Sequence, residues 1–348
     1  MRIDRIVVTG DVLRTADGDP NQLFNVRWLR GELSRVLYEL TGLWPDIRYR
    51  GNQPDGGRAI VAEWYRMLGR SPSVEGWAAT YALTTPPSAL VDALQPDYER
   101  ALVIGFELSP LLRAVLGRLG VPWVDVEVSP LRFLDDLALG LTFSWPVRIN
   151  HRGLLSRHHV GDAVRRIRFQ HRHHEAAADC DGACVFLAQT RHDRTLIKDG
   201  VFFPDSLSME CVARAVGGRR LVLKPHPLAP DNPLLDALRR RFAADTTDAN
   251  IYALLATVRE AQFLTISSSA AIEAQHFGHR VQRFNADAPV DPAAFVSAWA
   301  HRSAAFWRAA LAPLLPVRPD AASEEPMVPD RLRRSLHAWW GFVRAVPP

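Results

Sequence analysis

Two short apolar segments of the sequence end abruptly in polar side chains that could hold a phosphate. Segment 221–227 ends in a lysine and in a histidine between two prolines, and segment 263–269 ends in three serines. Such runs are typical of buried parallel strands, whose carboxyl ends open onto ligand sites. Ammonium, rigidly presented imidazole and hydroxyl groups at a helix start all donate to phosphate oxygens. The candidate residues for binding a phosphorylated ligand are Lys224, His226, Ser267, Ser268 and Ser269.

Several of these residues also have a plainer interpretation. His226 would serve as well as a loop residue bonded to a backbone carbonyl, and one serine is expected to cap the helix 270–277 that follows. Glu273 lies one turn into that helix, where it either faces the same site or is a solvated helical glutamate. Because a carboxylate repels phosphate, its expected partner at the site is a pair of ribose hydroxyls.

Two further carboxylates have the contexts that glycosyl chemistry requires. Asp193 follows the expected strand 183–189, among arginines that would keep a nucleophile ionised; the alternative is an ion pair on a loop. Glu127 alternates with Asp125 along the expected strand 121–128, so both point to one face. Glycosyl transfer needs one carboxylate to attack the anomeric carbon and another to move the acceptor proton.

The elements that must position these residues alternate between strands and helices, which predicts an α/β fold with parallel sheets covered by helices. The other expected strands are 6–9 and 101–106, and the other expected helices are 25–40, 58–68, 111–119, 206–216, 232–242 and 251–258. A chain of 348 residues fits two domains of ordinary size. The expected division is 1–170, 178–315 and a C-terminal part 316–348, with a linker at 316–329 and a basic amphipathic helix at 329–346.

The composition indicates a cytoplasmic globular protein. Hydrophobic residues make up 47% and charged residues 23%, and no apolar run approaches the roughly 20 residues of a membrane span or resembles a signal peptide. Three cysteines favour a reducing compartment. Neither the pair Cys180 and Cys184 nor the histidines 171, 173 and 174 have the partners of a metal site, so no metal is expected.

Basic residues crowd into 148–174, which is expected to be the exposed connection between the domains. This stretch would attract anions or an anionic membrane surface. Nucleic acid binding is disfavoured because aromatic residues are sparse among the arginines. Trp339 and Trp340 in the tail would either touch a bilayer or pack on the first domain.

Taken together, these motifs resemble the retaining β-Kdo glycosyltransferases, bacterial enzymes that move Kdo (3-deoxy-D-manno-oct-2-ulosonic acid) from CMP-Kdo onto capsule linkers or O-antigen glycans. The resemblance covers roughly residues 120–285 and rests on the Lys-Pro-His-Pro strand, the serine-rich strand end with Glu273, Gln189 followed four residues on by Asp193, and segment 126–133. Capsule-type members usually have an acidic residue and glycine after the strand-end glutamate. This chain has Val128-Ser129, which leans towards the O-antigen type.

The resemblance implies a GT-B fold of two Rossmann-like domains with a cleft between them and a C-terminal helix that returns to the first. It implies Asp193 as the nucleophile of a double displacement and Glu127 as the acid/base group. The CMP-sugar would be held by Gln189, Lys224, His226, Ser267, Ser268, Ser269 and Glu273. The acceptor would be a glycan, free or lipid-linked, and no metal or other cofactor would be required. The alternatives are an inverting transferase of the CMP-sialic-acid type and a non-catalytic glycan-binding or export subunit.

Overall fold

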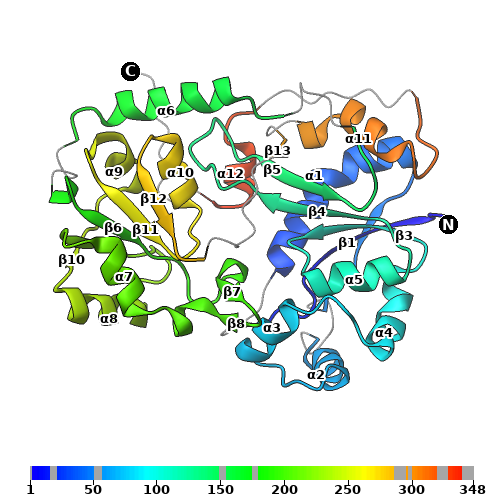
Figure 1. Ribbon diagram of the computed structural model, residues 1–348. Coiled ribbons are helices and arrows are strands. Elements are labelled where there is room, and N and C mark those ends of the chain that lie inside the picture. Colours follow the sequence, from blue (N-terminus) through cyan, green and yellow to red (C-terminus); the bar gives the residue numbers. More distant parts are fainter. Residues whose placement is uncertain are drawn as a thin grey trace. The chain divides into compact units, whose positions relative to one another are not determined.

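The computed structural model describes residues 2–15, 22–50, 57–148, 154–174, 179–285, 295–296, 300–319 and 328–338 (Figure 1). The chain divides into two compact α/β units. Unit 1 comprises Met1–Ser129, Ala138–Leu155 and Pro292–Leu336, and unit 2 comprises Pro130–Leu137, Ser156–Asp291 and His337–Pro348. In the described part of the chain, no helix combines the length and the apolar character needed to cross a bilayer.

Unit 1 is built on a six-stranded sheet in the order β13-β5-β4-β3-β1-β2. Four strands run parallel: β1 (Arg5–Gly10), β2 (Pro45–Ile47), β3 (Ala101–Phe106) and β4 (Trp123–Val128). At one edge β5 (Leu139–Phe143) pairs antiparallel with β4, and β13 (Phe295–Val296) pairs antiparallel with β5. Every residue of β3, and every residue of β1 after Arg5, is buried, as a sheet covered on both faces requires.

The helices of unit 1 are α1 (Leu23–Thr41), α2 (Arg58–Met67), α3 (Val74–Tyr81), α4 (Ser88–Tyr98), α5 (Pro110–Arg118), α11 (Ala304–Leu311) and α12 (Arg331–Ser335). The predicted helix 25–40 is confirmed as α1. Gly42 ends it at φ 73°, with its N–H donating to the carbonyl of Tyr38, the usual reason for glycine at this position.

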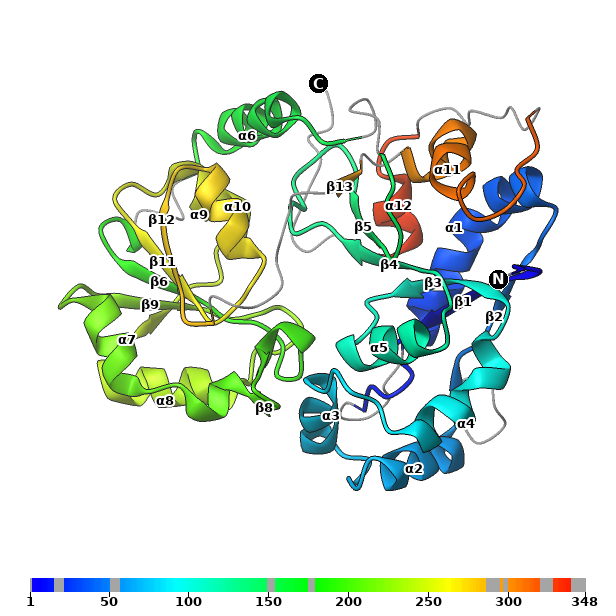
Figure 2. The ribbon, with the colours of Figure 1, turned by 45° about the vertical axis from the view of Figure 1, so that its right-hand side comes forward.

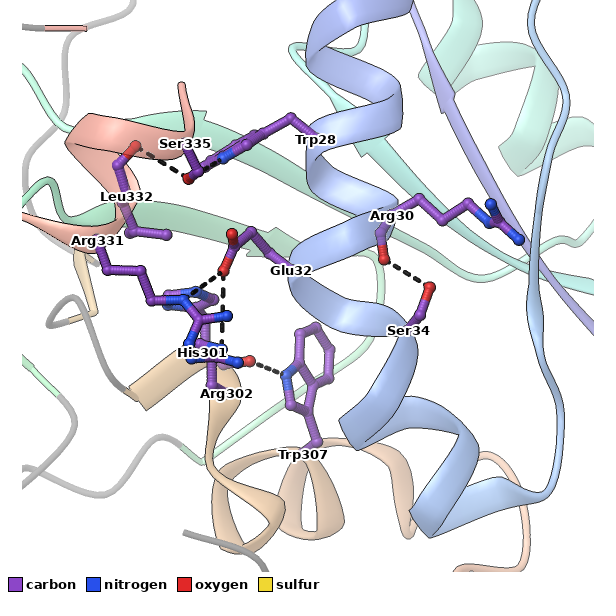
Figure 3. A network of polar contacts seen from close by, with 10 residues as sticks. All are labelled: Trp28, Arg30, Glu32, Ser34, His301, Arg302, Trp307, Arg331, Leu332 and Ser335. Carbon is purple, nitrogen blue, oxygen red and sulfur yellow. Dashed lines mark hydrogen bonds and ion pairs between the residues drawn. The ribbon is translucent and has the colours of Figure 1, made fainter. Parts of the chain in front are cut away.

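Segments from near the C-terminus complete unit 1 (Figure 3). Glu32 of α1 lies 3.7 Å from Arg302 Nε and 3.5 Å from Arg331 Nε, and Trp28 Nε1 donates to Ser335 Oγ at 2.8 Å. Of the expected helix 329–346, the described part contains α12, whereas Trp339 and Trp340 lie outside the described residues.

Unit 2 is built on a parallel five-stranded sheet in the order β10-β9-β6-β11-β12. Helices α7 and α8 cover one face, and α9 and α10 cover the other (Figures 1 and 2). The strands are β6 (Cys184–Leu187), β9 (Leu221–Lys224), β10 (Asp245–Thr246), β11 (Gln262–Thr265) and β12 (Arg280–Arg283). The helices are α6 (Arg157–His171), α7 (Met209–Val216), α8 (Pro233–Phe242), α9 (Ile251–Thr257) and α10 (Ala270–His276). Both units are therefore Rossmann-like.

The division of the chain differs from the expected one at three places. The basic stretch, expected to be an exposed connection between the domains, contains α6 at residues 157–171, which belongs to unit 2 and buries Val160, Ala163, Val164 and Ile167 there. Segment 130–137 also belongs to unit 2, whereas 300–319 belongs to unit 1. The chain therefore passes between the units more than once.

Candidate functional site

The carboxyl ends of β6, β9 and β11 meet at one edge of the unit 2 sheet. β6 lies between the other two, and Leu187 pairs in register with Lys224. The chain runs outward from β6 in both directions along the sheet, so the edge next to β6 and β11 is a topological switch point, where open α/β sheets bind ligands. The topology thus brings most of the predicted site residues to one place.

Gln189 and Ser267 bond to each other across the switch point. Gln189 Nε2 donates to Ser267 Oγ at 2.9 Å, and the backbone N–H of Ser267 donates to Gln189 Oε1 at 3.0 Å. Their exposed fractions are only 8% and 2%. Asn232 Nδ2 donates to the Gln189 carbonyl at 3.2 Å and so holds the same loop from α8. The two residues therefore form a buried hydrogen-bonded pair whose polar groups are already engaged.

A chain of hydrogen bonds continues from Ser267 through Thr195 to Asp193. Ser267 Oγ donates to Thr195 Oγ1 at 3.0 Å, and Thr195 Oγ1 donates to Asp193 Oδ1 at 2.9 Å. The backbone N–H of Thr195 reaches the same oxygen at 2.8 Å, and Asn285 Nδ2 fixes the Thr195 carbonyl at 3.0 Å. Hydrogen bonds in such a chain strengthen one another. Within the described residues, no hydrogen bond to Asp193 Oδ2 is formed, so one carboxylate oxygen is anchored and the other is presented.

His226 lies within electrostatic range of the Asp193 carboxylate. The backbone N–H of Leu228 donates to His226 Nδ1 at 3.1 Å, so the neutral ring carries its proton on Nε2. Burial lowers the pKa of His226, the charge of Asp193 acts in the opposite direction, and Lys224 lowers it further. Burial also lowers the pKa of Lys224, against the attraction of Asp248. The loop partner of His226 is thus an N–H group and not a carbonyl, which leaves Nε2–H to donate elsewhere.

The other two serines differ in their roles. Ser268 Oγ accepts from the N–H of Ala270 at 3.4 Å, a weak cap of α10, while Ser269 has helical dihedrals and makes no side-chain cap bond. Both side chains are half-buried at the end of β11. Of the three serines, these two remain in a position to meet a ligand.

Glu273 is buried and bonded to residues of its own unit. It is 2% exposed, and its Oε1 accepts from the N–H of Arg132 at 2.7 Å and from the hydroxyl of Tyr252 at 3.1 Å. Burial raises the pKa of this carboxyl to about 7 despite these bonds. Phe133 packs next to it against Tyr252 and Phe277. Glu273 Oε1 is therefore engaged inside unit 2 by segment 130–137, and the contact of Glu273 with a ribose stays a prediction.

Glu127 lies in unit 1, on β4, where it pairs in register with Gly140 and is half-buried. Its neighbour Asp125 is fully buried, accepts from the N–H of Leu108 at 2.8 Å and forms an ion pair with Arg113. Of these two carboxylates, Glu127 alone retains the exposure that proton exchange with a substrate requires.

The sequence analysis missed Thr195 and Asn285. Asp193-x-Thr195 matches a common local pattern in which an aspartate accepts from the N–H two residues on, so this contact was readable. It also missed the hairpin of β7 (Ile197–Lys198) and β8 (Val201–Phe202) beside Asp193. Its turn residues Asp199 and Gly200 both have positive φ, as the Asp-Gly dipeptide predicts.

Among the described residues, no three histidine, cysteine or acidic side chains are grouped so that they could hold a metal ion. Cys180 and Cys184 are buried in unit 2, and burial raises the pKa of each thiol, so both stay protonated. The His171 and His174 rings on α6 and its following turn are 5.8 Å apart.

No protein-family model matches the sequence, and a search of curated proteins finds no match either. Among solved structures, the chain is similar to the β-Kdo 2,7 transferase KpsC of Thermosulfurimonas dismutans, with 14% identity and a TM-score of 0.34 over 58% of this chain and 72% of that one. It is also similar to the UDP-GlcNAc 2-epimerase of Methanocaldococcus jannaschii, with 10% identity and a TM-score of 0.30 over 81% and 83%. At these values neither similarity supports an argument about activity, which has to rest on this chain's own residues.

Proposed function

We propose that this protein is a retaining glycosyltransferase that moves Kdo from CMP-Kdo onto a bacterial surface glycan, with a GT-B arrangement of its two units. The observation that carries the proposal is the Asp193 carboxylate at the switch point of unit 2. Thr195 holds one oxygen with two donors, and the carboxylate lies within electrostatic range of His226. The motif resemblance supports CMP-Kdo as the donor.

In the first step, Asp193 attacks the anomeric carbon of Kdo. A bond forms between the carboxylate oxygen and that carbon, and the bond from the carbon to the phosphate oxygen breaks. CMP leaves with the electron pair. Donation from His226 Nε2–H, the Lys224 ammonium and the Ser268 and Ser269 hydroxyls stabilises the charge on the departing phosphate. Fixed donors of this kind perform the neutralisation that a metal performs in other transferases.

In the second step, an acceptor hydroxyl attacks the same carbon and displaces Asp193, which regains its carboxylate. Glu127 accepts the hydroxyl proton. Two displacements at one carbon retain the configuration. Gln189 and Ser267 act in this scheme as positioning residues, because their side chains reach the reaction through Thr195.

The donor assignment is tested by thermal-shift measurements with CMP, UDP and GDP. Stabilisation by CMP alone supports it, and preference for UDP overturns it. Release of CMP from CMP-Kdo above background then excludes a non-catalytic glycan-binding or export subunit. Near-normal transfer by Asp193→Asn would instead favour an inverting CMP-nonulosonate transferase.

A further inference from the structure

Helix α6 carries a basic surface that the proposed chemistry does not use. Its apolar residues face unit 2, where α6 contacts α9 and α10 (Figures 1 and 2). Arg168 Nη2 fixes this side by donating to the Phe277 carbonyl at 2.6 Å. Because one face of α6 is occupied in this way, its remaining residues are directed outward.

The outward residues are strongly cationic. Residues 157–174 contain five arginines and five histidines but a single acidic residue, Asp162. Asp162 pairs with Arg165, and Asp135 pairs with Arg166 at 2.7 Å. Even with these two pairs, an excess of guanidinium groups remains on one short helix and its following turn. Charge complementarity requires an anionic partner.

An exposed aromatic ring lies within this cationic surface. Phe169 is 65% exposed and is spaced by helical turns from Arg165 and Arg172. The guanidinium carbon of Arg172 lies 3.8 Å from the centre of its ring. An apolar ring flanked by arginines matches a lipid interface, where the ring enters the headgroup region and the guanidinium groups bind phosphates.

We propose that α6 binds the surface of an anionic phospholipid bilayer. Phe169 inserts at the headgroup level, and Arg157, Arg165 and Arg172 contact lipid phosphates. Each arginine near an anionic membrane surface strengthens binding roughly fivefold. The inference does not depend on the identity of the sugar donor, since α6 contributes no residue to the candidate site.

The test uses the full chain in co-sedimentation with vesicles of phosphatidylcholine alone and of phosphatidylcholine mixed with phosphatidylglycerol. We expect binding to the mixed vesicles only. Arg165→Gln with Arg172→Gln should weaken it by roughly 25-fold, while the matched pair Arg240→Gln with Arg241→Gln on α8 leaves it within a few-fold. Phe169→Ala should weaken it at unchanged net charge. Thermal unfolding and CMP release by each variant verify that the fold and the candidate site are intact.

Three results would overturn the proposal. The first is an absence of binding to the mixed vesicles. The second is that the double arginine substitutions on α6 and on α8 weaken vesicle binding equally, which would mean that binding depends on the net charge of the protein and not on α6. The third is tighter binding to single-stranded or duplex nucleic acid than to vesicles, insensitive to Phe169→Ala, which would assign the surface to a different partner.

Discussion

Burial of the Glu273 carboxyl makes the free energy of unfolding depend on pH. Burial raises the pKa of its carboxyl from the usual 4.5 to about 7. Between these values the unfolded chain loses the proton and the folded chain keeps it, so the free energy of unfolding falls as pH rises. The difference, at 1.36 kcal/mol per pKa unit, corresponds to about 3 kcal/mol. The loss begins near pH 4.5 and levels off above about pH 7.

The substitution Glu273→Gln removes this titration. Its amide oxygen can still accept from the N–H of Arg132 and the hydroxyl of Tyr252. In urea unfolding followed by circular dichroism, the wild type should lose about 3 kcal/mol relative to this variant between pH 4.5 and pH 7. Glu260→Gln, at an exposed glutamate of the same unit, is the control. Because this variant keeps Glu273, the difference in unfolding free energy between it and the wild type should not vary with pH.

Two outcomes would refute the reasoning. A stability difference between wild type and Glu273→Gln that does not vary with pH would mean that the carboxyl is not buried as described. A loss of CMP affinity in a folded Glu273→Gln variant would mean that Glu273 contacts the ribose, as the sequence alone suggested. We expect CMP affinity to be unchanged, because Glu273 is directed towards segment 130–137.

Two further predictions concern the candidate site. Thr195→Val removes the hydroxyl that links Ser267 to Asp193 and should lower kcat by roughly tenfold to a hundredfold, the worth of a hydrogen bond to a charged group, with KM little changed. Thr195→Ser, which keeps the hydroxyl, should stay within a few-fold, and equal losses in both variants would contradict the role. His226→Ala should weaken CMP binding by a similar factor but leave cytidine binding unchanged in calorimetry, because the Leu228 N–H occupies Nδ1 and we propose that Nε2–H donates to the phosphate. Equal weakening of both ligands would place His226 elsewhere.

The strands that end in polar residues were predictable from the sequence. The runs 221–224 and 263–266 are β9 and β11 within a residue, because a buried parallel strand must be apolar throughout. Helix α6 was also readable in principle, since Val160, Ala163, Val164 and Ile167 follow helical spacing. The density of charges around them concealed that period.

The hydrogen-bond partners at the site were not predictable. Gln189 and Ser267 have side chains suited to a ligand, and nothing local shows that they bond to each other across 78 positions. Glu273 likewise depends on Arg132, which the fold brings to it from a distant part of the chain. The sequence thus shows which residue types could form the site, whereas their hydrogen-bond partners depend on the tertiary structure.

The central claim is that Asp193 forms a covalent bond to the sugar. Intact-mass spectrometry of the Glu127→Gln variant incubated with CMP-Kdo, followed by peptide mapping, tests it most directly. We predict an added mass of one Kdo residue on the peptide that contains Asp193, and its absence in the variant that also carries Asp193→Asn. An unmodified protein that still releases CMP, together with near-normal transfer by Asp193→Asn alone, would contradict the account.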